Sequence, residues 1–111
     1  MSAYVSSMIE GDVFKALADP TRRRIFEKLA TGSMNASALR EGMAISQPAM
    51  SQHLQVLRNA ALVREERQGR TVRYEVDPEG LASIANWLAR YRLYWPERID
   101  ALRDVLKEID Q

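Results

Sequence analysis

The chain has 111 residues, the size of one domain, and its 46% hydrophobic and 28% charged residues are typical of a soluble folded protein. The formal net charge of +1 gives no global attraction to nucleic acid or membrane, so any basic patch must be local. There is no cysteine, which excludes disulfides, thiolate metal sites, iron–sulfur clusters and thiol catalysis. No apolar run approaches the roughly 18 residues that cross a bilayer, and the start lacks a signal-peptide pattern. We therefore expect a cytoplasmic protein with no membrane partner.

Two helices are predicted in the first third of the chain. Apolar residues recur at helical spacing over 8–18, whereas the first seven residues look frayed. A second helix is predicted over 20–30, because Asp19 is a good N-cap and proline is tolerated at the first helical position. Three arginines lie in its first turn, and we interpret them as a solvated face, with phosphate contact as the alternative: Arg22, Arg23 and Arg24.

Residues 36–60 predict a helix-turn-helix. A short helix is expected over 36–43, followed by a tight turn and a helix that is capped by Ser46 and runs to Ala60. The second of these helices has an apolar stripe at positions i, i+4, i+7 and i+11, which should face the core: Met50, Leu54, Leu57 and Ala61.

The hydrophobic period then changes from 3.6 to 2. Residues 62–67 and 71–76 flank a turn that contains Gly69, and this pattern predicts a β-hairpin, here called the wing, over 62–76. A final apolar stripe predicts one long helix over 79–110, which Pro96 should kink or divide near Trp95. The fold class is mainly α (α+β). The predicted order of helix, helix, helix, helix, hairpin, helix describes a single winged helix-turn-helix domain over 1–111.

The outward face of the helix that follows Ser46 carries polar but uncharged side chains. Each glutamine or serine there can donate and accept hydrogen bonds, which suits base edges in a DNA major groove. The wing supplies arginines that can neutralise phosphates. The predicted DNA-binding residues are Ser46, Gln47, Pro48, Ser51, Gln52, Gln55, Arg67, Arg70 and Arg73.

Three segments resemble the ArsR-type winged-helix repressors. They are the run SQPAMSQHLQVLR over 46–58, with Ala-Leu-Val at 61–63 and Gly-Arg at 69–70, and the earlier run ALADPTRR over 16–23. The resemblance implies a homodimeric repressor of double-stranded operator DNA whose first and last helices, 8–18 and 79–110, form the dimer interface. The interface residues expected on these helices are Ile9, Val13, Leu88, Tyr91, Trp95, Ile99, Leu102 and Leu106.

The chain departs from the metal-sensing members of that family. Their Cys-x-Cys positions correspond here to Asn35 and Ser37, neither of which is a thiolate ligand. The last helix offers Asp100, Asp104 and Glu108 on one face but no histidine, and we interpret these carboxylates as a solvated face. No metal or other cofactor is predicted. The C-terminal residues that resemble a metal-free branch of the family are Trp87, Tyr91, Tyr94, Trp95, Glu97 and Arg98.

Several features leave alternatives open. His53, the single histidine, is expected to bond to the backbone or to orient the DNA-reading helix. The alternative is that its protonation senses pH. The aromatic group of Trp87, Tyr91, Tyr94 and Trp95 predicts packing in the dimer interface, or else a pocket for an unknown small-molecule effector. The balanced charge also allows a winged-helix module that binds a protein instead of DNA. No catalytic constellation is present, so an enzyme is not expected.

Overall fold

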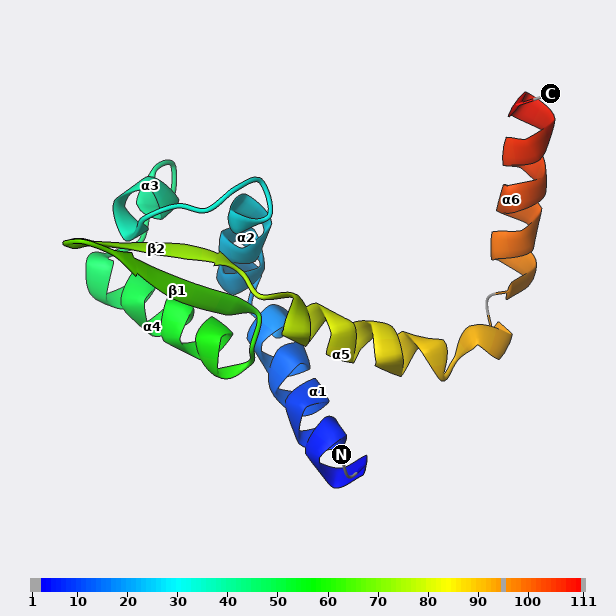
Figure 1. Ribbon diagram of the computed structural model, residues 1–111, viewed down its shortest axis with the longest axis horizontal. Helices are drawn as coiled ribbons and strands as arrows, with labels where there is room; N and C mark the ends of the chain where they lie inside the picture. The colour runs from blue at the N-terminus through cyan, green and yellow to red at the C-terminus, as the bar shows by residue number, and fades with distance from the viewer. Residues whose placement is uncertain (1–2, 95, 111) are drawn as a thin grey trace.

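The computed structural model describes residues 3–94 and 96–110, with side chains described for residues 10–92, 94, 100 and 103–109. Figure 1 shows the elements in chain order: α1 (Ala3–Ala18), α2 (Pro20–Leu29), α3 (Ala36–Arg40), α4 (Gln47–Asn59), β1 (Val63–Gln68), β2 (Thr71–Val76), α5 (Pro78–Ala89), the 3-10 turn η1 (Arg92–Tyr94) and α6 (Pro96–Asp110). This is the predicted winged helix-turn-helix. Among the described residues, no helix is long and apolar enough to cross a membrane.

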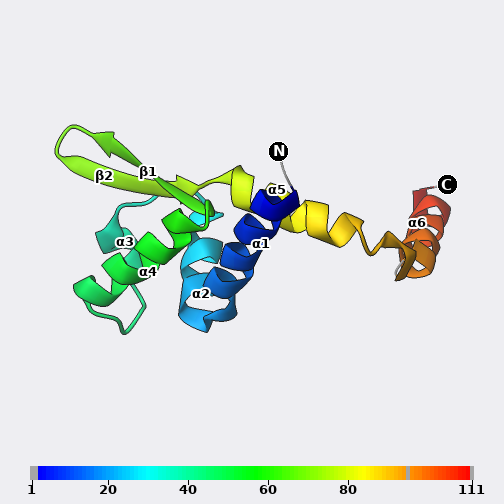
Figure 2. The same cartoon turned by 90° about the horizontal axis from the view of Figure 1, so that it is seen from below.

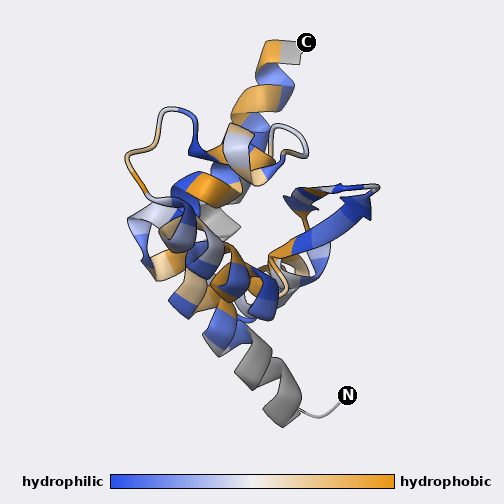
Figure 3. Cartoon of the chain, turned by 90° about the vertical axis from the view of Figure 1, so that its left-hand side faces the viewer, coloured by the Kyte–Doolittle hydropathy of each residue, from blue (hydrophilic) through white to orange (hydrophobic). Residues whose placement is uncertain are grey.

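The core lies where α1, α2, α3 and α4 meet the base of the hairpin. Its fully buried large side chains come from all of these elements: Val13, Ile25, Leu39, Met50, Leu57, Leu62 and Val63. Each such side chain contributes about 1.5–3 kcal/mol by leaving water. Figure 3 shows hydrophobic segments gathered between the helices, whereas most of the hairpin is hydrophilic. The body is therefore held by helix packing, and the wing extends from it.

Two helix boundaries differ from the prediction. Helix α1 begins at Ala3 instead of Met8, so the segment expected to fray is helical. Helix α3 ends at Arg40 instead of Met43, because the chain turns at Gly42, whose φ of 75° is in the left-handed region that glycine adopts readily. Met43 still packs against the core, but from the turn.

The end of α4 corrects the predicted apolar stripe. Ala60 is 3% exposed and fills the core position, whereas Ala61 lies beyond the helix with a φ of 57°. This left-handed residue turns the chain from α4 into β1. Its carbonyl then accepts a hydrogen bond of 2.8 Å from the amide of Gly80 in α5. The join between helix and wing is thus also the point where α5 is attached.

The wing is a two-stranded antiparallel ribbon in which Gln68 pairs with Thr71 around a two-residue turn. Gly69 has a φ of 64°, which suits the first position of such a turn. Tyr74 also exchanges backbone hydrogen bonds of 2.7 and 3.0 Å with Met34, which lies between α2 and α3. One edge of β2 is therefore fixed to the body, while the tip of the wing projects beyond it.

The C-terminal helix is divided, as expected from Pro96, but the break is wider than predicted. Helix α5 ends at Ala89, and the amides of Arg90, Tyr91 and Tyr94 bond to the third residue before each of them. These tighter turns of the 3-10 type replace the α-helix over the residues that lead from α5 into η1. Helix α6 stands apart from the body, and Figure 2 shows it at the end of the molecule opposite the wing tip.

Candidate nucleic-acid interface

The exposed face of α4 carries the predicted base-reading residues. Helix α4 begins with Ser46, whose Oγ accepts a hydrogen bond of 3.2 Å from the amide of Ala49, so the predicted N-cap is confirmed. Met50, Leu54 and Leu57 are buried on the opposite side of the helix. The exposed residues on and beside this face are Ser46, Gln47, Pro48, Ser51, Gln52, Gln55, the apolar Val56 and Asn59.

These polar side chains are not all equally available. Among the described residues, Gln47, Ser51 and Gln52 have no side-chain hydrogen-bond partner within the protein. Gln55 differs, because its Nε2 donates to Asn59 Oδ1 at 2.8 Å and its Oε1 accepts from Arg58. The sequence pattern could not reveal this difference, since it identifies only the side of the helix on which a residue lies.

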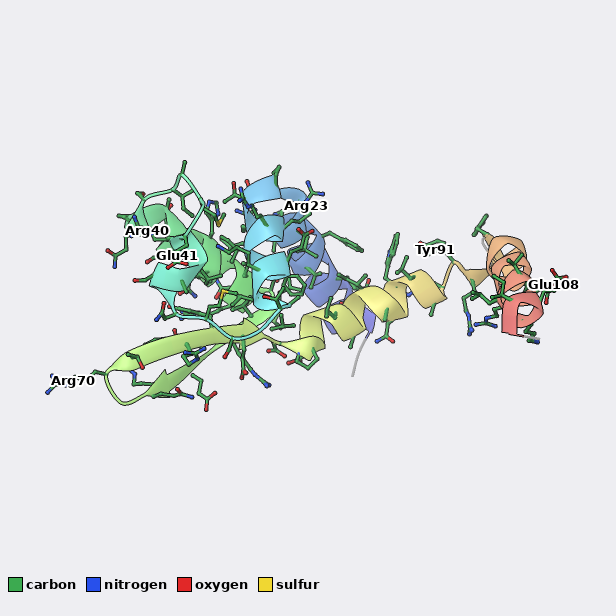
Figure 4. The ribbon with its side chains drawn as sticks, turned by 90° about the horizontal axis from the view of Figure 1, so that it is seen from above. Arg23, Arg40, Glu41, Arg70, Tyr91 and Glu108 are labelled. Carbon is green, nitrogen blue, oxygen red and sulfur yellow. The ribbon has the colours of Figure 1, made fainter. Side chains whose placement is uncertain are left out.

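The wing arginines also fall into two groups. Arg67 and Arg70 are exposed, and Figure 4 shows Arg70 projecting beyond the tip. Arg73 is bound back to the body, with its guanidinium donating to the carbonyl of Ser33 at 2.7 Å and to the hydroxyl of Ser33 at 3.2 Å. Arg64 pairs with Glu75 at 2.7 Å, and the hydrogen bond that its Nε donates to this carboxylate raises the pKa of Arg64. The tip therefore carries the wing's unpartnered positive charge among the described residues.

The three arginines of α2 have separate roles. Arg22 donates from Nε to the carbonyl of Ala16 at 2.8 Å and from Nη2 to that of Lys15 at 3.2 Å, so it caps the C-terminus of α1. Arg24 donates to the carbonyl of Gly42 at 3.2 Å. Arg23 and Arg24 are exposed, as expected for a solvated face, and Figure 4 shows Arg23, whereas Arg22 is half-buried against α1.

The turn of the helix-turn-helix is held by Arg24 and by Lys28, which the sequence analysis did not single out. Lys28 Nζ donates to the carbonyls of Leu39 and Glu41, both at 2.7 Å, at the C-terminal end of α3. Positive charge at a helix C-terminus is favourable. Together with the bond from Arg24, these contacts fix the turn that leads into α4.

His53 is half-buried on α4 and faces α2. Its Nδ1 lies 3.5 Å from Nη1 of Arg22, so its neighbour is a side chain and not the backbone. This contact requires Nδ1 to be the unprotonated ring nitrogen. Arg22 thereby links the end of α1 to the side of α4.

The predicted dimer residues are found in different environments. Leu88, Tyr91 and Leu106 are exposed by 41%, 42% and 52%, and Val13 is fully buried in the chain's own core. Trp95 lies outside the described residues, as do the side chains of Ile9, Ile99 and Leu102.

The aromatic residues form a row from α1 to η1. Ring centroids are 5.0 Å apart for Phe14–Trp87, 4.9 Å for Trp87–Tyr91 and 6.3 Å for Tyr91–Tyr94. Figure 4 shows Tyr91 at the end of α5 that points away from the body. The row leaves Tyr94 84% exposed, so its outer end has no cover within the chain.

The two positions that the family resemblance matched to metal-ligating cysteines have other contacts or are exposed. Asn35 caps α3 by accepting a hydrogen bond of 2.8 Å from the amide of Ala38, and Ser37 is exposed. Asp100, Asp104 and Glu108 are exposed on α6, and no cluster of three metal-ligating side chains occurs in the part of the chain that the structure describes.

Comparisons with known proteins agree with this architecture. Residues 17–66 match a family model described as a helix-turn-helix domain. The chain is 36% identical over 80 residues to the transcriptional repressor SdpR of Bacillus subtilis, covering 72% of this chain and 89% of SdpR. It is 44% identical over 78 residues to the HTH-type transcriptional regulator Rv2034 of Mycobacterium tuberculosis, covering 70% of this chain and 73% of that protein.

Solved structures show the same relationship. An ArsR family transcriptional regulator superposes with a TM-score of 0.73 at 28% identity, covering 81% of this chain and 93% of the other. An ArsR-like transcriptional regulator from Rhodococcus sp. RHA1 superposes with a TM-score of 0.71 at 30% identity, covering 89% of this chain and 93% of the other. With its winged helix-turn-helix and these relatives, the chain belongs to the ArsR family of DNA-binding transcriptional regulators and is not an enzyme.

Proposed function

We propose that the chain acts as a homodimer that binds an inverted-repeat operator and represses transcription from the promoter that contains it. One observation carries this proposal. The N-terminal half of α4, with its uncharged polar face, and the arginine-bearing tip of the wing lie toward the same end of the molecule (Figures 1 and 2). Groups that donate and accept can read base edges, and arginines can neutralise the flanking phosphates.

The roles within this surface follow from chemistry and exposure. Gln47, Ser51, Gln52 and Gln55 would contact bases in the major groove. Ser46 caps α4 through the amide of Ala49, and Pro48 in the same turn has no amide hydrogen, so the amide of Gln47 is the group of this turn that would hold a phosphate. Arg67 and Arg70 would bind the DNA backbone or enter the minor groove. Arg73 is bound to Ser33 of the body, so its charge would act on DNA from the middle of the wing and not from its tip.

A dimer is supported by apolar side chains that the single chain leaves uncovered. Leu88 of α5, Tyr91 just beyond the end of α5 and Leu106 of α6 are each at least two-fifths exposed. A second copy would cover such side chains by packing on them. Two copies of α4 about 34 Å apart would then enter successive major grooves on one side of B-DNA. Repression is supported by SdpR, which is described as a repressor.

The test is selection of bound duplexes from a random DNA pool by the purified protein at about physiological salt. Recovery of an inverted repeat with half-sites about 10 base pairs apart would support a dimeric, sequence-reading regulator. Recovery of a single half-site would contradict the dimer. Recovery of nothing above background would contradict DNA reading and favour a protein partner for the same surface.

Variants at two positions separate base reading from phosphate binding. Gln52→Ala should relax sequence preference with little change on random DNA. Arg70→Ala should weaken binding to all duplexes alike and reduce the salt slope by about one unit. Arg64→Ala is the matched control, since it removes the same charge from a wing residue that is already paired with Glu75. Equal losses for Gln52→Ala and Arg70→Ala on operator and random DNA would contradict this division of roles.

A further inference from the structure

A hydrogen-bond network joins the wing to the exposed face of α4. The guanidinium of Arg58, near the end of α4, donates through Nη1 to the carboxylate of Glu65 on β1 and through Nη2 to Oε1 of Gln55. Gln55 Nε2 in turn donates to Asn59 Oδ1 at 2.8 Å. The network thus runs from a wing carboxylate to one of the side chains that would contact bases.

The network settles which way the Gln55 amide points. An amide oxygen placed against a guanidinium and an amide nitrogen placed against Asn59 Oδ1 give one favourable orientation, and the flipped amide would set donor against donor. Each end of the amide keeps one further bonding site, an N–H and a lone pair. An adjacent donor and acceptor of this kind match the N7 and N6 edge of adenine in the major groove.

The same network neutralises Arg58. The side chains of Arg58 and Glu65 are 30% and 43% exposed, so their ion pair adds little to the stability of the fold. The larger consequence of the ion pair is that the positive charge of Arg58 on the α4 surface is already bound by the carboxylate of Glu65. A phosphate would have to displace Glu65 to use that charge.

The strand pairing explains why Glu65 has this role and Glu66 does not. Neighbouring residues of a strand point to opposite faces of the ribbon. Glu65 pairs in register with Tyr74 and shares a face with the buried Val63, whereas Glu66 pairs with Arg73 on the other face. Arg58 is within reach of the first face alone.

We propose that Glu65 is a specificity-determining positioning residue. Through Arg58 it holds the Gln55 amide in one orientation for a base, and it withholds the Arg58 charge from DNA phosphates. Both effects favour the operator over random DNA. This inference rests on the proposed function, because it assigns the origin of part of the sequence preference to a residue that itself reads no base.

The test compares Glu65→Gln with Glu66→Gln, which makes the same change of charge at the adjacent residue on the opposite face. Affinities for the selected operator and for a random duplex are measured over a range of salt concentrations. In Glu65→Gln, random-DNA affinity should rise about threefold to fivefold relative to Glu66→Gln, because Arg58 becomes available to a phosphate. The salt slope should steepen by about one unit, and the operator-to-random ratio should fall. Matching thermal unfolding midpoints would show that both variants keep the fold.

A second set of variants, all carrying Arg58→Gln, tests whether Glu65 acts through Arg58. In Arg58→Gln, adding Glu65→Gln should change the operator-to-random ratio no more than adding Glu66→Gln does. If Glu65→Gln and Glu66→Gln have the same ratio and salt slope in the wild-type background, or if Glu65→Gln keeps its full effect without Arg58, the inference is wrong while the proposed function stands. If the wild-type protein itself prefers no sequence, both are wrong.

Discussion

The carboxylate of Glu10 in α1 lies 2.6 Å from the guanidinium of Arg90 at the C-terminal end of α5, although 80 residues separate them in the chain. The Glu10 side chain is 8% exposed and that of Arg90 is 50% exposed, so a nearly buried carboxylate is partnered by a half-exposed cation. Helices α1 and α5 also contact each other. The ion pair therefore holds the C-terminal end of α5 against α1.

Replacing Arg90 should show how much the Glu10–Arg90 ion pair contributes to the free energy of unfolding. Arg90→Met leaves the Glu10 carboxylate without its partner, and we expect the free energy of unfolding to fall by about 1–2 kcal/mol, reduced from the value for a fully buried pair by the exposure of Arg90. Urea unfolding at fixed protein concentration measures the change. Arg92→Met is the control, and an equal loss in both variants would show that the ion pair has no special role.

Two glycines should respond in opposite ways to alanine. A Cβ on Gly80 would lie 2.7 Å from the carbonyl oxygen of Ala61, where backbone cannot move without disturbing the join between α4 and the wing. Gly80→Ala should lower the free energy of unfolding by about 1–3 kcal/mol. Gly11 has nothing within 4 Å and lies inside α1, so Gly11→Ala should stabilise by up to about 1 kcal/mol. Thermal unfolding of both variants checks the signs, and destabilisation by Gly11→Ala would contradict the packing around α1.

The cap that Arg22 forms on α1 predicts a difference between neighbouring arginines. Arg22→Ala removes two hydrogen bonds to helix-terminal carbonyls and the contact with His53. We expect a loss of about 1–2 kcal/mol in the free energy of unfolding. Arg23→Ala removes the same charge from an exposed position and should change stability by less than about 0.5 kcal/mol. Similar values for the two variants, measured by urea unfolding, would contradict the capping role.

Asp19 predicts part of the acid sensitivity of the fold. The backbone amide of Arg22 donates to its carboxylate at 2.9 Å, and this hydrogen bond holds the pKa of Asp19 below its ordinary value. A lowered folded-state pKa means that the contribution is complete above the unfolded pKa of about 3.9 and is lost as the pH falls through the lower, folded-state value.

The matched variant for this prediction is Asp19→Asn. Asparagine also caps helices well, so stability near neutral pH should change by less than about 0.5 kcal/mol. Because the variant cannot titrate, its stability should fall less than that of the wild type as the pH is lowered from about 5, above the unfolded aspartate pKa, to about 2. Parallel loss of stability in the two proteins over this range, followed by circular dichroism, would contradict the role of Asp19.

Much of the fold was predictable because its signals are local. Asp19 and Ser46 each cap a helix whose first turn contains proline, and both caps are confirmed. Gly69 marks the wing turn, and Pro96 begins a new helix. Apolar spacing identified Met50, Leu54 and Leu57 as the buried side of α4. Each of these features depends on residues within a few positions of one another.

Other features were missed because apolar spacing does not report where a helix stops. The left-handed turn at Ala61 closes the end of α4, with the amides of Ala61 and Leu62 bonded to the carbonyls of Arg58 and Leu57. The early end of α5 was missed as well, since apolar spacing continues through the 3-10 turns that replace the helix.

The sequence by itself determined the order of elements, the caps, the inward face of α4 and the uncharged polar character of its outward face. These follow from periodicity and short-range hydrogen bonding, which the order of residues specifies directly. The tertiary structure alone decided which charged and amide groups remain available on that surface. Arg22, Arg58 and Arg73 look alike in the sequence, yet one caps α1, one pairs with Glu65 and one is bound to Ser33. A long side chain takes whichever acceptor the fold brings within hydrogen-bonding distance, and that acceptor comes from another part of the chain.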